Sequence, residues 1–397
     1  MLMHVFKLIW NRKRANALII AELALAFLVV FFIAAVGAHF LHRWNQPLGF
    51  EWRNTLEILP SKALVGQSWS EEDGRRARAL VSTLEDQPEV EWVHHSFPPF
   101  RQWAWRTSVG LDERQVGVNV NWMSDGAPED FGVELLEGRF FAETDATPDR
   151  IPVLIDQQVA AAIFPRGFEP GRDIRLRDDS EERPSWIAVG VFRAFRQQGE
   201  LGAVRPYLIA RFPKEDLTQG ISTLQVRLKA GTPVSFEEKL QELVGAEADT
   251  WSVTVTPLER LRADRIREMV LPLMVAFWIA AFLLLMVAFG LFGVLWQSVT
   301  RRTDELGLRR ALGAPKGRIY HLIVVETLAI AVFASLVACV VAIQFPVTGA
   351  FPALDWRASL TGMGLGLVTL LALAGICSLY PAWLASRPSP AEALHYE

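Results

Sequence analysis

The sequence has few of the features that are typical of several classes of protein, and each absence excludes one of those classes. It has 2 cysteines in 397 residues, too few for a disulfide-stapled scaffold. Charged residues make up 21%, below the roughly 25% that is typical of soluble domains. The mean hydropathy of +0.21 is nevertheless too low for an all-helical transporter. A net charge of -4 gives no indication of a nucleic-acid partner. The composition therefore indicates a few membrane spans joined to a sizeable water-soluble part.

Residues that would carry chemistry are also missing. No serine, cysteine or paired-carboxylate constellation stands out, and no G-x-x-x-x-G-K-[ST] motif occurs; the cluster Gly313–Arg318 fails that pattern. His94 and His95 are adjacent on a predicted strand, where they point to opposite faces, so a metal site is disfavoured. Asp178–Glu182 is predicted to be a solvated acidic loop. We therefore expect a non-catalytic chain that binds no cofactor or metal of its own.

Four segments free of Asp, Glu, Lys and Arg are long enough to span a bilayer as helices. They are Leu23–Leu41, Met269–Thr300, Thr327–Leu354 and Ala358–Ser386. Pro346 should end the third helix near Phe345. Glu22 and Glu326 lie just inside the spans that they open. Each suits either a carboxylate near the headgroups or, alternatively, an interhelical hydrogen bond or a coupling contact.

Charge sets the expected orientation. The segment before the first span and the link between the second and third spans each carry a net charge of +4, so both should be cytoplasmic. The intervening region, about His42 to Glu268, must then lie outside, with a net charge of -9. Both Cys339 and Cys377 fall within spans, so the outer region depends on its core alone for stability.

The outer region begins and ends with the same order of elements. A strand at Asn54–Leu59, a helix to about Asp86 and a strand at Val90–His95 open it, with Leu80, Val81 and Leu84 facing inward. Near its end, Thr223–Leu228, Ser235–Val244 and Trp251–Val255 repeat strand, helix and strand, with inward-facing Phe236, Leu240 and Leu243. Two βαβ units at the two ends predict one α/β subdomain built from both. Short strand signals between them predict an inserted, mainly β subdomain; they are Gln115–Val120, Val153–Ile155, Trp186–Val191 and Tyr207–Ala210.

The predicted fold is thus an α-helical membrane protein with four transmembrane helices, one plus three, and a large α/β and β domain inserted between the first two. The helix that follows Pro257 has no breaker before the second span, so we expect a stalk continuous with it. The expected boundaries are 1–16 cytoplasmic, 17–41 span one, 42–268 outer domain (α/β part 50–97 and 214–256, β part 98–213, stalk 257–268), 269–299 span two, 300–318 coupling loop, 319–345 span three, 346–357 outer loop, 358–385 span four and 386–397 cytoplasmic.

Three further patterns leave alternatives open. Trp103–Trp105, with Phe97 and Phe100, suits core packing better than an apolar binding surface. Gly362, Gly364 and Gly366 form a small-residue face that either receives another helix or faces lipid. The segment Arg301–Arg318 contains a short basic amphipathic helix, which suits a docking element or a loop lying on anionic lipid.

The same segment resembles a loop of FtsX-like, MacB-type ABC transporter permeases, whose pattern is R-x-x-E-I-G-x-R-R-A-L-G-A. Here the sequence is Arg301-Arg-Thr-Asp-Glu-Leu-Gly-Leu-Arg-Arg-Ala-Leu-Gly313. Leu136–Asp145 is similar to the G-R-x-F-x-x-x-D signature of that family's periplasmic domain. Glu326 fits the family's glutamate, and Pro381–Glu397 resembles its C-terminal ending, with His395 in place of arginine. The glycines often seen after Glu326 are absent. The resemblance covers essentially the whole chain.

The resemblance implies a permease subunit that couples ATP hydrolysis, on a separate ATPase subunit dimer that binds ATP and Mg, to movement of a periplasmic domain. It implies a bacterial inner-membrane location and a second permease, identical or related. Coupling residues would be Arg301, Arg302, Glu305, Leu306, Leu308, Arg309, Arg310 and Leu312, and packing residues Gly362, Gly366 and Glu326. Efflux with a periplasmic adaptor and an outer-membrane channel is the first hypothesis. Lipoprotein extraction and activation of a periplasmic hydrolase are the alternatives.

Overall fold

The computed structural model describes residues 13–62, 71–102, 105–111, 113–145, 147, 150–176, 185–212, 223–247, 251–302, 308–309 and 312–386. It divides into two compact units. Met1–Trp44 and Val270–Glu397 form one, which we call the helix unit. Asn45–Met269 forms the other, which we call the sheet unit.

Within the described residues, four helices are long and apolar enough to cross a membrane, and the candidate spans are Ala17–Trp44, Leu258–Thr300, Lys316–Thr348 and Trp356–Ala385. The helices themselves are α2 (Lys13–Trp44), α7 (Leu258–Thr300), α9 (Lys316–Ala342), α10 (Gln344–Thr348) and α11 (Trp356–Ala385). The predicted order of one span, an inserted domain and three spans is therefore confirmed.

Several prolines, among them Pro272, Pro346 and Pro381, lie inside helices without ending them. Pro272 lies within α7, which runs unbroken from Leu258 to Thr300. Pro346 does not stop the third span at residue 345; α9 already ends at Ala342, and Pro346 is the third residue of α10. In a first helical turn the missing N–H of proline has no intrahelical partner to lose.

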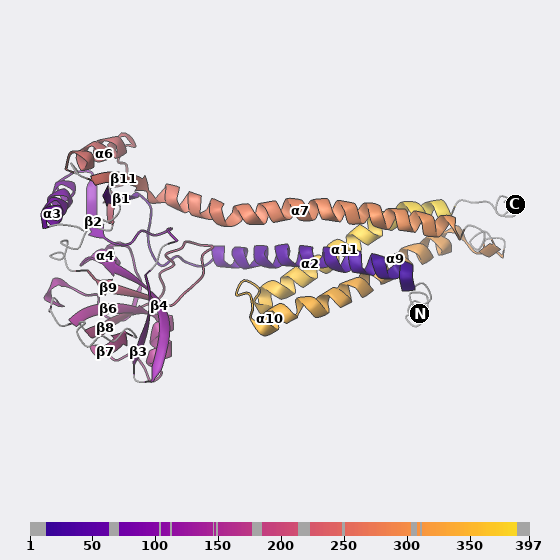
Figure 1. Ribbon diagram of the computed structural model, residues 1–397, viewed down its shortest axis with the longest axis horizontal. Coiled ribbons are helices and arrows are strands. Elements are labelled where there is room, and N and C mark those ends of the chain that lie inside the picture. The colour runs from indigo at the N-terminus through magenta and orange to yellow at the C-terminus, as the bar shows by residue number, and fades with distance from the viewer. Residues whose placement is uncertain are drawn as a thin grey trace. The chain divides into compact units, whose positions relative to one another are not determined.

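Helices α2, α9 and α11 lie side by side in the helix unit (Figure 1). Their common core contains large side chains from α2, including Phe27 and Phe31, which are fully buried. Small side chains from α9 and α11 face them, among them Ala331, Ala334, Ala338 and Ala374. Small residues allow close approach of helix backbones, which favours association where lipid is the solvent.

The four-stranded sheet of the sheet unit joins segments from both of its ends. Its strands and covering helices are β1 (Thr55–Lys62), α3 (Glu71–Glu85), β2 (Val90–His95), β10 (Leu224–Leu228), α6 (Ser235–Glu247) and β11 (Trp251–Pro257). The strand order is β11-β1-β10-β2, and every neighbouring pair is antiparallel. Each βαβ unit therefore places a strand of the other unit between its own two strands, which is the split βαβ arrangement. The prediction of one subdomain assembled from both ends is confirmed.

The helices cover the sheet through residues four apart. Leu80 and Leu84 of α3 are fully buried, as predicted, and Val81 is partly buried beside them. On α6 the fully buried series continues from Phe236 and Leu240 to Val244, whereas the predicted Leu243 is half-buried. The i, i+4 spacing keeps all three buried residues on one stripe.

The insertion forms a second sheet. Its elements are β3 (Trp105–Leu111), β4 (Arg114–Met123), α4 (Ala127–Asp130), β5 (Leu135–Gly138), η1 (Glu143–Asp145), β6 (Arg150–Asp156), α5 (Gln157–Ile163), β7 (Arg172–Leu176), β8 (Ser185–Phe192) and β9 (Tyr207–Arg211). The order is β5-β8-β6-β9-β4-β3-β7, and a further pairing of β7 with β8 closes the sheet on itself. We call this part the barrel subdomain. Its mainly β character agrees with the prediction.

The aromatic stretch has a structural role in this subdomain. The ring centroid of Trp105 lies 6.1 Å from those of Trp122 and Trp186, and Phe100 is buried. This agrees with packing rather than with an exposed binding surface; Trp103 lies outside the described residues, as does the acidic run Asp178–Glu182.

Candidate functional site

The residues expected to couple to an ATPase follow the end of α7. Arg301 is exposed, and the side chains of Leu308 and Leu312 are 58% and 80% exposed. The Leu312 N–H donates to the Leu308 carbonyl at 3.0 Å, which is the hydrogen bond of a helical turn. Glu305, Leu306 and Arg310 lie outside the described residues. The described part of the segment thus presents two exposed leucines next to the basic residues of the sequence.

An ion pair connects this segment to the next helix. Arg302 Nη1 lies 3.3 Å from Glu326 Oε2 and 3.5 Å from Oε1, and both side chains are largely buried. Glu326 of α9 therefore pairs with a residue that lies two positions beyond the end of α7. Charged groups in a span are costly unless paired, so each side chain restricts the position of the other.

An apolar cluster surrounds the same end of the helix unit. Ile319 and Ile323 of α9 are buried against Ala382 and Ala385 of α11, and Val299 of α7 packs on them. Beside this cluster Trp296 stacks on Tyr380 with an interplanar angle of 7°. Three helices thus meet where the candidate coupling segment begins.

Glycines of α11 lie against α2. A Cβ on Gly362 would lie 2.7 Å from the Phe31 carbonyl oxygen and 2.9 Å from the Ala35 Cβ. A Cβ on Gly366 would approach the Phe27 ring to 3.1 Å, whereas nothing lies within 4 Å of Gly364. Gly362 and Gly366 therefore lie in a close helix contact that a larger residue would disturb.

Sequence reasoning missed one contact of this kind. A Cβ on Gly290 of α7 would lie 2.9 Å from Glu22 Oε1, so the carboxylate of α2 lies directly against the backbone of α7. The two glycines of α7, Gly290 and Gly293, give no helical repeat that marks a packing face, and nothing in the pattern links Gly290 to a residue so far away in the chain.

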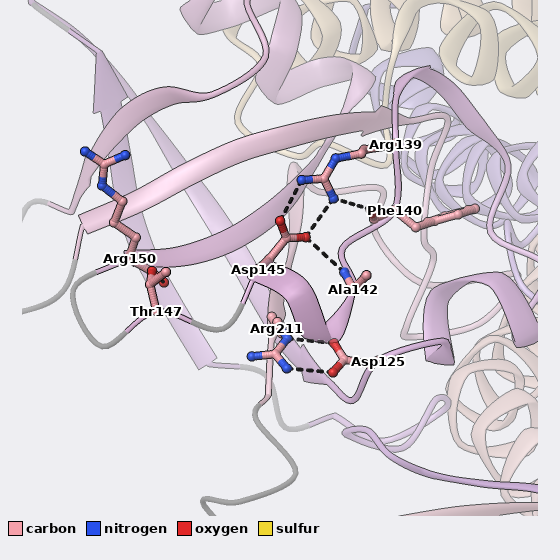
Figure 2. A network of polar contacts seen from close by, with 8 residues as sticks. All are labelled: Asp125, Arg139, Phe140, Ala142, Asp145, Thr147, Arg150 and Arg211. Atoms are coloured by element: carbon pink, nitrogen blue, oxygen red, sulfur yellow. Dashed lines mark hydrogen bonds and ion pairs between the residues drawn. The ribbon is translucent and has the colours of Figure 1, made fainter.

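The G-R-x-F-x-x-x-D signature forms a polar network in the barrel subdomain (Figure 2). Arg139 donates to both carboxylate oxygens of Asp145, at 2.6 and 2.7 Å, and Asp145 also accepts from the Ala142 N–H at 3.0 Å. These bonds hold the pKa of Asp145 below its usual value, first through Arg139. The signature residues therefore fix the chain between β5 and β6 rather than form a reactive site.

A second pair lies beside that network in Figure 2. Arg211, at the end of β9, donates to both oxygens of Asp125 at 2.7 and 2.6 Å, and its side chain is 5% exposed. Its positive charge further lowers the pKa of Asp145. The first pair therefore fixes one local segment, whereas the second connects β9 to the residues that follow β4.

The adjacent histidines are packed into the interior. His94 lies with Nε2 2.6 Å from Asp130 and Nδ1 3.1 Å from Ser124. His95 stacks on Phe212, with ring centroids 3.8 Å apart, and burial lowers its pKa to about 4. Among the residues that the structure describes, no three His, Cys, Asp or Glu side chains form a group suited to a metal ion.

Comparison with known proteins agrees with the architecture. Residues 17–243 match the MacB-like periplasmic core domain family, and residues 277–390 match the FtsX-like permease C-terminal family. The crystal structure of the periplasmic region of MacB from Actinobacillus actinomycetemcomitans aligns with a TM-score of 0.39 and 13% identity, over 54% of this chain and 94% of that one.

The proteins with related sequences are named as ATP-binding/permease proteins or as a permease. The macrolide export ATP-binding/permease protein MacB of Neisseria gonorrhoeae is 30% identical over 218 residues, 52% of this chain and 32% of that protein. The MacB of Hahella chejuensis is 24% identical over 99% of this chain and 60% of its own length. The uncharacterized ABC transporter permease YknZ of Bacillus subtilis is 22% identical over 72% of each. The chain thus spans less than two thirds of the MacB proteins that it matches. With its periplasmic core domain and its FtsX-like helices, the chain belongs to the MacB-like family of ABC transporter permeases.

Proposed function

We propose that this chain is the permease subunit of an ABC transporter of the bacterial inner membrane. ATP and Mg are bound by a separate ATPase subunit dimer, and this chain converts ATP hydrolysis into movement of the sheet unit in the periplasm. Efflux of a periplasmic substrate, with an adaptor and an outer-membrane channel as partners, is the proposed use of that movement. The observation that carries the proposal is α7, one helix of 43 residues that begins in the sheet unit and ends beside the coupling segment.

The inner end of α7 suits a docking role. Exposed Leu308 and Leu312 offer apolar surface, and basic side chains accompany them. An amphipathic helix commonly inserts its apolar face into a groove of a partner protein. Any displacement of this segment would reach α9 through the Arg302–Glu326 pair.

The length of α7 suits transmission. At about 1.5 Å per residue, a helix of this size is longer than the roughly 30 Å hydrocarbon core of a bilayer. A continuous helix is stiff along its axis, so a shift at one end is felt at the other. Nucleotide can drive such a shift only if the ATPase contacts the segment differently in its two nucleotide states.

The test is ATP hydrolysis by the co-purified complex in lipid nanodiscs. Leu308→Ala with Leu312→Ala should reduce stimulation of the ATPase by the permease about fivefold or more, because the apolar contact is lost. Reversing the charges of Glu305, Arg309 and Arg310 should abolish it. Membrane insertion should remain normal in both variants.

The matched control is Leu360→Ala on α11, a leucine that is 62% exposed but distant in sequence from the coupling segment. It should leave stimulation unchanged. Equal stimulation in the double leucine variant and the control would contradict docking through this surface. The subunits that co-purify distinguish the functions: an adaptor supports efflux, a lipoprotein chaperone supports extraction, and a cell-wall hydrolase supports signalling.

A further inference from the structure

The loop between β8 and β9, residues 193–206, holds the segment that follows α2 in the chain. The Arg196 N–H donates to the Leu48 carbonyl at 2.9 Å, and Arg196 Nη1 donates to the Gln46 carbonyl at 3.1 Å. Gly49 has a φ of +81°, and a Cβ there would lie 1.9 Å from the Ala194 carbonyl oxygen. This approach requires glycine at position 49. The β8–β9 loop and the residues after α2 are therefore in direct backbone contact.

The same loop holds the first turns of α7. Arg262 Nε donates to Glu200 Oε1 at 2.5 Å, and the Glu200 side chain is only 8% exposed. The Arg262 guanidinium also lies over the Trp52 ring, 4.8 Å from its centroid. Leu258, the first residue of α7, is fully buried in an aromatic cluster that includes Phe195 of the loop. A planar guanidinium stacked on an aromatic ring and paired with a buried carboxylate has a well-defined position.

Strained backbone is concentrated at this contact. Among the residues that the structure describes, two that are not glycine have a positive φ, Asn54 at 54° and Phe100 at 69°. The Asn54 N–H donates to Glu259 Oε1 of α7 at 3.0 Å, and the Phe100 N–H donates to the Gln197 carbonyl of the loop at 2.6 Å. Asparagine tolerates this conformation, but a phenylalanine holds it only where packing enforces it. Strain of this kind persists where the surroundings fix one geometry, which suits a contact that transmits force.

From these contacts we propose that the β8–β9 loop is the element through which α7 moves the barrel subdomain, with Glu200 and Arg262 as its positioning residues. The inference rests on the proposed function. One loop receives both chain segments that connect the sheet unit to membrane helices. A displacement of α7 relative to the segment after α2 therefore acts on the barrel subdomain at this loop, as well as on the four-stranded sheet through β11, which ends where α7 begins. The Arg262–Glu200 pair passes the displacement on because neither side chain can move without breaking it.

The test is hydrogen exchange of the loop peptide 193–206 in the intact complex, with and without an ATP analogue trapped on the ATPase. In the unmodified complex, the analogue should change exchange of this peptide and of the barrel strands. Glu200→Gln, which keeps the shape of the side chain but removes its charge, should lose most of that change while α7 remains helical and ATP hydrolysis continues. Arg262→Lys keeps the charge but not the planar stacking on Trp52, and should show an intermediate response.

Arg193→Gln is the matched control, because Arg193 belongs to the same loop but pairs with exposed Glu134 and not with α7. It should respond as the unmodified complex does. A full response in both Glu200→Gln and Arg262→Lys would overturn the role of the loop and leave the proposed function intact. If Glu200→Gln unfolds the sheet unit, the Arg262→Lys result decides. An unmodified complex with no nucleotide-dependent change would overturn the proposed function, and the role of the loop with it.

Discussion

The two units of this protein bury their interiors in different ways. The sheet unit encloses large aromatic and aliphatic side chains, and arginine–carboxylate pairs connect its loops and strands. The helix unit packs alanine and glycine of α9 and α11 against phenylalanines of α2. In water, burial of apolar surface drives packing, whereas in lipid close contact between helices must do so. Substitutions should therefore fail for different reasons in the two units.

Removal of the partner of a buried carboxylate in the sheet unit should have the largest effect. Arg101 donates to both oxygens of Glu57, whose side chain is fully buried in β1. Arg101→Ala leaves that carboxylate buried and unpaired, which should cost about 3–5 kcal/mol of stability. Hydrogen exchange of the β1 and β10 amides would measure it. Arg193→Ala breaks the exposed pair with Glu134 and should change stability far less, because solvent screens that pair. Equal effects of the two substitutions would show that burial does not set the strength of these pairs.

Acid should weaken the four-stranded subdomain through His95. Because its folded-state pKa is about 4, against an ordinary value of 6.5, only the unfolded chain takes up a proton in that interval. The part of the stability that depends on neutral His95 is fully present above about pH 6.5 and should fall by at most about 3 kcal/mol as the pH drops to 4. His95→Phe keeps the stack on Phe212 and removes the titration, so its unfolding should lose this part of the pH dependence. An identical pH profile in the variant would contradict the assignment.

Asp156 should act in the opposite direction in the barrel subdomain. Burial raises its pKa to about 6, although its carboxylate accepts from the N–H groups of Val159 and Tyr207. The folded state therefore holds a proton that the unfolded chain has released, and this part of the stability falls as the pH rises through 4 to 6. Hydrogen exchange followed separately in the two subdomains should show that, between about pH 4 and 6, stability rises with pH in the four-stranded subdomain and falls with pH in the barrel subdomain. A common slope in both subdomains would argue against separate titrations.

Overpacking the helix unit should have a smaller effect. Gly362→Leu forces α11 away from Phe31 and Ala35 of α2, which should cost about 1–3 kcal/mol. Gly364→Leu, two residues away on an open face, should be tolerated. Thermal stability of the protein in detergent would compare the two. Similar losses for both would mean that the glycine face is not a close helix contact.

Sequence reasoning succeeded where local periodicity carries the signal. The helix around Leu80 and Leu84 and the strand Val90–His95 follow from residue spacing, and the four long apolar helices follow from the length of the uncharged segments. The closure of the barrel subdomain by β7 and β8 had no such signal, because pairing between distant strands depends on the whole chain.

The candidate site shows the same limit. The basic segment after α7 is visible as a pattern, but the pairing of Arg302 with Glu326 and of Arg262 with Glu200 joins residues that no short motif connects. The β8–β9 loop was likewise missed, since its glycines and polar residues read as an ordinary connection. Its positive-φ glycine, Gly199, becomes informative only when the Phe100 ring that lies against it is known.

One measurement tests transmission through α7 most directly. Spin labels would be attached at exposed positions 78 and 166, one in each subdomain of the sheet unit, after Cys339 and Cys377 are replaced. Pulsed electron paramagnetic resonance would then measure the distance between the two labels. Three glycines inserted after Glu268 break the stiffness of α7, and three inserted after Gly349 serve as the control. We expect the nucleotide-dependent change in separation to disappear with the first insertion and persist with the second, while ATP hydrolysis continues in both. A change that survives the break in α7 would contradict the account.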